Sequence, residues 1–247
     1  MPAGGEGDDR PAIVFVHATR LTGAQWAAQV AELSAEFRCF APDLPGHGIA
    51  AGTTFTLDDA ARAITRVIEI EAGGPAIVVG LSLGSYVALD VAARRPDLVR
   101  GLVLAGVTVE PGGVRSVPFH GLARLYASVP EGWLYRQQAR SFRRYPARIA
   151  GPILDDGFSF RGGGAAVRSL VGERFRPRLA AYPGPVLLVN GQRDLLFRLG
   201  ARSFKRAAND ARHVVIRGAG HRSNLDQPGA FSAIVRRFAM QIKDAGA

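Results

Sequence analysis

Short apolar runs alternate along the chain with longer helical patterns, and this alternation constrains the fold more than any other feature of the sequence. The runs are rich in Val, Ile and Leu, which is typical of parallel strands buried on both faces. We therefore predict an α/β fold, a mainly parallel central sheet with helices on both faces. The predicted strands are Ala12–Val16, Phe37–Ala41, Ala76–Gly80, Leu98–Ala105, Pro185–Val189 and His213–Ile216, and the predicted helices are Ala24–Ala35, Leu57–Ala72, Leu83–Arg94, Ala201–Ala208 and Gly229–Ala245.

Residues 112–184 interrupt this alternation. Because these residues lie between two predicted strands, we predict that they form a mostly helical cap. The cap would be inserted into a core made of residues 1–111 and 185–247. The segment contains twelve arginines and four acidic residues, a local net charge of +8 within a chain of net charge +10. It also contains many aromatic side chains, namely Phe119, Tyr126, Trp133, Tyr135, Phe142, Tyr145, Phe158, Phe160 and Phe175.

The composition excludes several classes of protein. Hydrophobic residues make up 47% and charged residues 21% of the 247 residues, the ordinary range for one globular domain. Without a signal-peptide pattern or an apolar run of roughly 18 residues, we expect no membrane span and a cytoplasmic location. The single cysteine, Cys39, cannot form an internal disulfide, and we expect it to be buried. Motifs of nucleic-acid binding are not found, so no nucleic-acid partner is expected.

The pattern Gly80-Leu81-Ser82-Leu83-Gly84 carries the clearest chemical signal. It joins a predicted strand to a predicted helix, where a sharp turn can expose the serine at the carboxyl end of the strand. A serine hydroxyl is a weak nucleophile near neutral pH and needs an adjacent base. The sequence therefore predicts Ser82 as a nucleophile, provided that a base lies close by.

His221 and Asp194 are the predicted partners of Ser82. Asp194 follows the strand Pro185–Val189, and His221 follows the strand His213–Ile216, so all three side chains lie beyond carboxyl ends of parallel strands. We predict His221 as the general base and Asp194 as the carboxylate that orients it. The other histidines considered, His120 and His213, have no matching motif and are predicted to be structural or surface residues.

With these motifs, the chain resembles the α/β-hydrolase superfamily of lipase- and esterase-like serine hydrolases. The order Ser, Asp, His along the chain is the order that this fold uses. Asp43 and His47 resemble the family's structural turn. The further matching segments are Ile13-Val14-Phe15-Val16-His17, Trp26, Ala41-Pro42-Asp43-Leu44-Pro45-Gly46-His47-Gly48, Gln192-Arg193-Asp194 and Gly220-His221 followed by Gln227-Pro228.

The resemblance also implies an oxyanion hole, and the sequence departs from the pattern of the family at two places. The backbone N–H groups of Thr19 and Leu83 would be its donors, and no cofactor or metal would be needed. Ala18 stands where relatives usually carry a glycine, so we expect this loop to be shaped differently, with Arg20 pointing either into the site or into solvent. Because few residues precede Ala12, we also expect the sheet to lack an antiparallel hairpin at that edge.

Three functions remain open from the sequence. The first is hydrolysis of a carboxylic ester or thioester through an acyl-enzyme, with an acidic small molecule or an acidic acyl carrier protein as a partner suggested by the charge of the cap. The second uses the same triad as a carbon–carbon bond hydrolase, lyase or cyclase. The third is a non-catalytic ligand receptor. The sequence leaves the substrate and the oligomeric state open.

Overall fold

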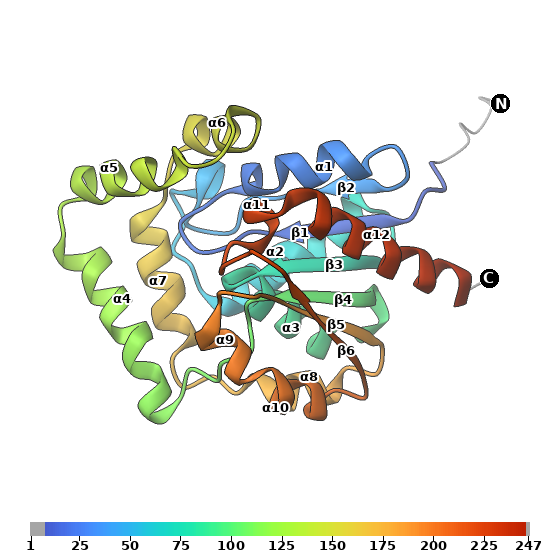
Figure 1. Cartoon of the computed structure of the whole chain (residues 1–247). Helices are drawn as coiled ribbons and strands as arrows, with labels where there is room; N and C mark the ends of the chain where they lie inside the picture. The colour runs from blue at the N-terminus through green and yellow to red at the C-terminus, as the bar shows by residue number, and fades with distance from the viewer. Residues whose placement is uncertain (1–7, 246–247) are drawn as a thin grey trace.

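A six-stranded parallel sheet forms the centre of the molecule, as the sequence predicted (Figure 1). The computed structural model describes residues 8–245. Every neighbouring pair of strands is parallel, and the order across the sheet is β2-β1-β3-β4-β5-β6. The strands are β1 (Ala12–Val16), β2 (Arg38–Phe40), β3 (Ala76–Leu81), β4 (Val99–Ala105), β5 (Pro185–Gly191) and β6 (Asp210–Ile216).

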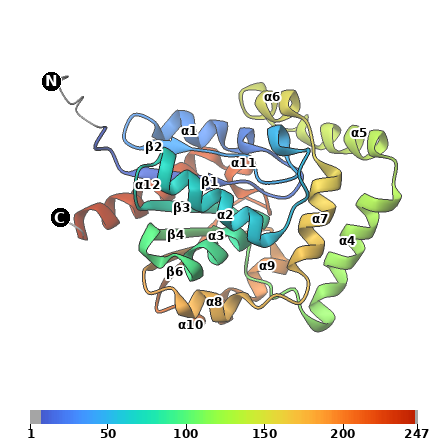
Figure 2. The ribbon, with the colours of Figure 1, turned by 180° about the vertical axis from the view of Figure 1, so that it is seen from behind.

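Helices cover both faces of the sheet, which Figures 1 and 2 show from opposite sides. One face packs on α2 (Leu57–Arg66), α3 (Leu83–Arg94), α8 (Phe175–Ala181) and α10 (Ala201–Ala207), and the other on α1 (Ala27–Leu33) and α12 (Pro228–Ala245). Successive strand residues alternate between the two cores: Val14 belongs to the first and Phe15 to the second. The continuous apolar runs thus have their predicted cause, burial on both faces.

A helical insertion lies between β4 and β5. Its helices α4 (Val117–Ser128), α5 (Glu131–Phe142), α6 (Ala147–Asp156) and α7 (Phe160–Leu170) gather at the end of the sheet where the strands terminate (Figure 1). α4 packs against α7, and α8 instead packs against α3 beside the sheet. The domain boundaries at residues 112 and 184 stay predictions, and the position of α8 favours a shorter insertion.

Several predicted elements differ in detail from the observed ones. The predicted helix at 24–35 begins as a 3₁₀ turn, Gly23–Trp26, and the predicted helix at 57–72 continues α2 with a π-helical turn, Val67–Glu71. Short helices α9 (Leu195–Leu199) and α11 (Ser223–Asp226) were not predicted. Cys39 is half-buried in β2 rather than buried, because β2 lies at the edge of the sheet. Further 3₁₀ turns are Gly48–Ala50, Pro96–Leu98 and Gly113–Ser116.

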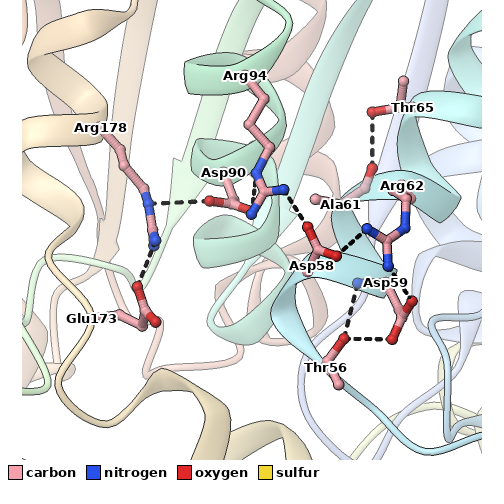
Figure 3. A network of polar contacts seen from close by, with 10 residues as sticks. All are labelled: Thr56, Asp58, Asp59, Ala61, Arg62, Thr65, Asp90, Arg94, Glu173 and Arg178. Atoms are coloured by element: carbon pink, nitrogen blue, oxygen red, sulfur yellow. Dashed lines mark hydrogen bonds and ion pairs between the residues drawn. The ribbon is translucent and has the colours of Figure 1, made fainter.

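A chain of ion pairs joins the helices beside α3 (Figure 3). Asp90 of α3 is buried and lies 2.8 Å from Nε of Arg94 and 3.1 Å from Nε of Arg178 in α8. Arg94 also pairs with Asp58 of α2, and Arg178 pairs with Glu173. Burial raises the pKa of Asp90, and the two arginines oppose that rise. Because the carboxylate of Asp90 is buried, losing Arg178 would leave it with less compensation, so this pair joins α8 to α3. The pair of Arg94 with Asp58 links α3 to α2 at the surface.

Within the described residues, no helix combines the length and the apolar character needed to cross a membrane.

Candidate active site

Ser82 occupies a strained turn between β3 and α3. Its backbone has φ 54° and ψ −114°, a region that non-glycine residues rarely adopt, and its N–H donates a 2.8 Å hydrogen bond to the carbonyl of Ala105. The turn requires a close approach of two backbones, because a Cβ atom at Gly84 would lie 2.0 Å from the carbonyl oxygen of Val16. Glycine at 84 therefore lets α3 begin directly behind Ser82, which stays partly exposed.

Asp194 and His221 meet beyond the ends of β5 and β6. Nδ1–H of His221 donates to Oδ2 of Asp194 at 2.7 Å, and the Asp194 side chain is 7% exposed against 36% for His221. This bond fixes the imidazole orientation and leaves Nε2 as the free nitrogen, the arrangement in which a histidine accepts a proton. The two loops also bond to each other, because Arg193 N–H donates to the carbonyl of Ala219 at 2.8 Å.

Two residues that the sequence did not single out shape the space around this histidine. The ring of Phe197, in α9, stacks on the imidazole at 4.5 Å between centroids. Gly106, directly after β4, has φ 59°, and a Cβ atom there would lie 2.8 Å from Cε1 of His221. A glycine directly after a predicted strand could have indicated this close approach, whereas no sequence pattern indicates the role of Phe197.

Ser82 and His221 line one cavity of about 340 Å³ between the sheet and the insertion. Thr19 and Leu83, the predicted oxyanion-hole donors, line the same cavity. Leu83 is the first residue of α3, where backbone N–H groups lack partners within the helix. Most of the wall is apolar and comes from both core and insertion: Leu21, Tyr86, Pro118, Phe119, Leu122, Val167, Leu170, Leu196 and Phe197.

The loop after β1 is held by a neutral, buried histidine. Nδ1–H of His17 donates to the carbonyl of Ala18 at 2.9 Å, and Nε2 accepts the N–H of Leu44 at 2.9 Å. Burial, with a smaller contribution from His47, lowers the pKa of His17 to about 3. Both bonds together need the neutral ring, so His17 connects this loop to the turn after β2.

Ala18 is accommodated without strain, and the unusual backbone angle falls instead on Arg20. Within residues 8–245, the non-glycine residues with positive φ are Arg20, at 69°, and Ser82. The altered shape that we expected for this loop is therefore found at Arg20. We expected its side chain to point either into the site or into solvent, and Arg20 lines the cavity that contains Ser82.

A network of buried amides connects this loop to the histidine loop. Ala18 N–H donates to Oε1 of Gln25 at 2.8 Å. Nδ2 of Asn224, in α11 after His221, donates to the backbone carbonyl of Gln25 and to Oε1 of Gln29, both at 3.2 Å. Sequence reasoning missed these three amides, because a buried amide is recognised only by the partners that the fold brings to it.

The remaining sequence candidates lie in structural positions. Asp43 accepts hydrogen bonds from the backbone N–H groups of Gly23, at 2.7 Å, and Ile49, at 2.9 Å, which fixes the turn after β2. His47 is buried beside His17, with 5.0 Å between ring centroids. Nε2 of His213 lies 2.9 Å from Oδ1 of Asn190, and His120 is exposed on α4.

Comparison with known families gives this geometry its context. A model of the alpha/beta hydrolase family matches residues 13–234. The chain belongs to the alpha/beta hydrolase family. The parallel sheet and the helical insertion after β4 are thus features of a hydrolase of this family.

Several relatives and solved structures are similar to this chain over most of its length. The pimeloyl-[acyl-carrier protein] methyl ester esterase of Xanthomonas campestris is 31% identical, with 92% of this chain and 94% of the esterase covered. Protein PHYLLO of Arabidopsis thaliana is 25% identical over 98% of this chain, which spans only 16% of that protein. The enol-lactonase from Burkholderia xenovorans LB400 shares the fold, with a TM-score of 0.81, 23% identity and coverage of 96% of this chain and 94% of that chain.

The neutral state of His17 predicts a dependence of stability on pH. Its pKa is about 3 in the folded protein and about 6.5 when unfolded, so its contribution is complete above pH 6.5 and is lost progressively as the pH falls towards 3. Between pH 7 and pH 5 the loss is about 2 kcal/mol. Urea unfolding at both pH values measures this loss of unfolding free energy. The loss should be smaller by that amount in His17→Gln than in the wild type. Equal losses in the two proteins would contradict the assignment.

Gly106→Ala tests the space beside His221. The new methyl group would displace the imidazole, so we expect labelling of Ser82 by a fluorophosphonate to slow at least tenfold, with a loss of about 1–2 kcal/mol in stability from the positive φ. Gly73→Ala is the matched control, because Gly73 has φ 65° and no atom within 4 Å of the added Cβ. It should lose similar stability and keep the labelling rate. Unchanged labelling in Gly106→Ala would show that this contact does not position the histidine.

Proposed function

We propose that this hydrolase cleaves a carboxylic ester or thioester through a covalent acyl-enzyme on Ser82. The observation that carries the proposal is that Ser82 and His221 line one cavity while Asp194 holds the far nitrogen of that histidine at 2.7 Å. The similarity to relatives adds support, since a methyl ester esterase matches this chain nearly end to end. A mostly apolar cavity wall suits the acyl chain of such a substrate.

The proposed reaction has two halves. The Ser82 oxygen bonds to the carbonyl carbon of the substrate while Nε2 of His221 takes the proton of the Ser82 hydroxyl. The N–H groups of Thr19 and Leu83 stabilise the oxyanion that forms. When the bond to the leaving group breaks, His221 gives the proton to the departing alcohol or thiol. Water then attacks the acyl-enzyme in the same way and releases the acid. Asp194 stabilises the imidazolium in both halves.

Ser82→Ala tests this proposal directly. The wild type should react with a fluorophosphonate and hydrolyse p-nitrophenyl esters, and the variant should lose labelling and at least about a thousandfold in kcat/KM. Ser128→Ala, at an exposed position on α4, is the control and should retain both. Ester turnover that survives in Ser82→Ala would contradict the proposal.

Assays of the wild type with further substrates and ligands distinguish the other two functions. Cleavage of 1,3-diketones in preference to esters would favour carbon–carbon bond hydrolysis by the same triad. A wild type that binds ligands but neither reacts with the probe nor turns over esters would favour a receptor.

An acidic acyl carrier protein is the partner that we propose for a carrier-bound substrate. Arg136, Arg140 and Arg143 are exposed at positions that share one face of α5 and its C-terminal end, and none forms an ion pair within the described residues. A carrier of opposite charge would be attracted to this face, and salt would weaken that attraction.

Charge reversal at these three arginines tests the carrier. We expect the ratio of kcat/KM for a carrier-bound ester to that for the free ester to fall about tenfold in Arg136→Glu/Arg140→Glu/Arg143→Glu. The matched control reverses Arg202, Lys205 and Arg206, which are exposed on α10, and should keep the ratio. A ratio that depends neither on this charge reversal nor on salt concentration would contradict the proposal of an acidic carrier protein as partner.

A further inference from the structure

Two arginine residues line the cavity that contains Ser82. They are Arg20, in the loop after β1, and Arg222, directly after His221. The described residues that line this cavity include no aspartate or glutamate. The other wall residues are largely apolar, so the lining of the cavity supplies no carboxylate as a counter-charge for either arginine.

Arg20 is held in this cavity from several sides. Its carbonyl accepts the N–H of Ser159 at 2.9 Å, and its guanidinium lies over the ring of Tyr126, 5.1 Å from the centroid. Among the described residues, its buried Nε has no hydrogen-bond partner. Burial lowers the pKa of Arg20, which means that the surroundings oppose its charge. A ring face compensates a buried cation less than a carboxylate does.

Arg222 has similar surroundings. Its guanidinium packs over the rings of Phe142, at 4.7 Å, and Tyr145, at 5.6 Å. Its only polar side-chain contacts within residues 8–245 are with Oγ of Ser141, at 3.5 Å, the outer limit of a hydrogen bond. Burial lowers the pKa of Arg222, Tyr145 and Asp226 oppose this effect, and the nearby charges of Arg144 and Arg20 add to it.

Asp226, a carboxylate close to Arg222, is already engaged elsewhere. Asp226 accepts hydrogen bonds from Tyr145, at 2.6 Å, from Arg144, at 3.0 Å, and from the N–H of Gly220, at 2.7 Å. Its charge is therefore shared with Arg144, and it forms no ion pair with Arg222 in the described part of the chain.

We propose that the substrate carries a free carboxylate besides its scissile ester, and that Arg20 and Arg222 bind this carboxylate. A planar carboxylate matches the fork of guanidinium donors and would supply the missing counter-charge, whereas the apolar wall would hold the carbon chain between the two ends. The substrate class is thus the half-ester or half-thioester of a dicarboxylic acid. This proposal rests on the proposed esterase function of Ser82.

A pair of esters with equal chain length tests the proposal. Monomethyl adipate has a carboxylate where methyl hexanoate has a methyl group, so the ratio of their kcat/KM values isolates the contribution of the charge. We expect the wild type to prefer monomethyl adipate at least tenfold, and Arg20→Met and Arg222→Met each to lower that ratio at least tenfold. Arg237→Met, at an exposed position on α12, removes one positive charge elsewhere and should keep the ratio.

A binding measurement in Ser82→Ala is independent of turnover. Calorimetry should show that adipate binds at least tenfold more tightly than hexanoate, and that adding Arg20→Met or Arg222→Met removes the difference. Arg20→Lys keeps a charge and should retain part of the preference, which covers the case in which Arg20→Met does not fold.

The outcomes separate the two proposals. Turnover of both esters with a wild-type ratio near one, together with equal binding of adipate and hexanoate, would overturn the carboxylate site and leave the esterase function intact. Arginine-dependent binding of adipate without turnover of either ester would overturn the esterase function and leave the carboxylate site intact.

Discussion

The contact between α3 and β1 is the constraint on which the site depends. Because position 84 has no side chain, the first turn of α3 lies against the carbonyl of Val16. This approach forces the sharp turn at Ser82 and brings the start of α3 beside the loop that follows β1. Ion pairs around Asp90 then hold the other half of α3 between α2 and α8 (Figure 3). The strained turn is thus part of a helix that is held at its start by β1 and further along by α2 and α8.

The loops around the cavity are fixed by buried polar groups. His17 joins the loop after β1 to the turn after β2, and the amides of Gln25, Gln29 and Asn224 join the same loop to the segment after His221. Such networks are stable only when their members are satisfied, which makes the relative positions of these loops specific. The relative position of Ser82 and His221 therefore depends on residues that touch neither of them.

Much of this architecture could be predicted from the sequence. Apolar runs and helical periods gave the strands, the sheet class and the loops of Ser82, Asp194 and His221, because these signals are local. The orientation of Arg20 could not be predicted, since it depends on a positive φ and on Tyr126 in the insertion. The space at Gly106 and the amide network likewise depend on contacts between distant segments, which no local pattern specifies.

The insertion is tied to the loop after β1 by hydrogen bonds at three positions of that loop, residues 19, 20 and 22. Thr19 donates to the carbonyl of Gly163, Ser159 donates to that of Arg20, and Thr22 donates to Asp156. A swing of α6 and α7 away from the sheet must either break these bonds or drag the loop with it. The position of the insertion and the shape of the loop beside Ser82 are therefore coupled, so that a change in one disturbs the other.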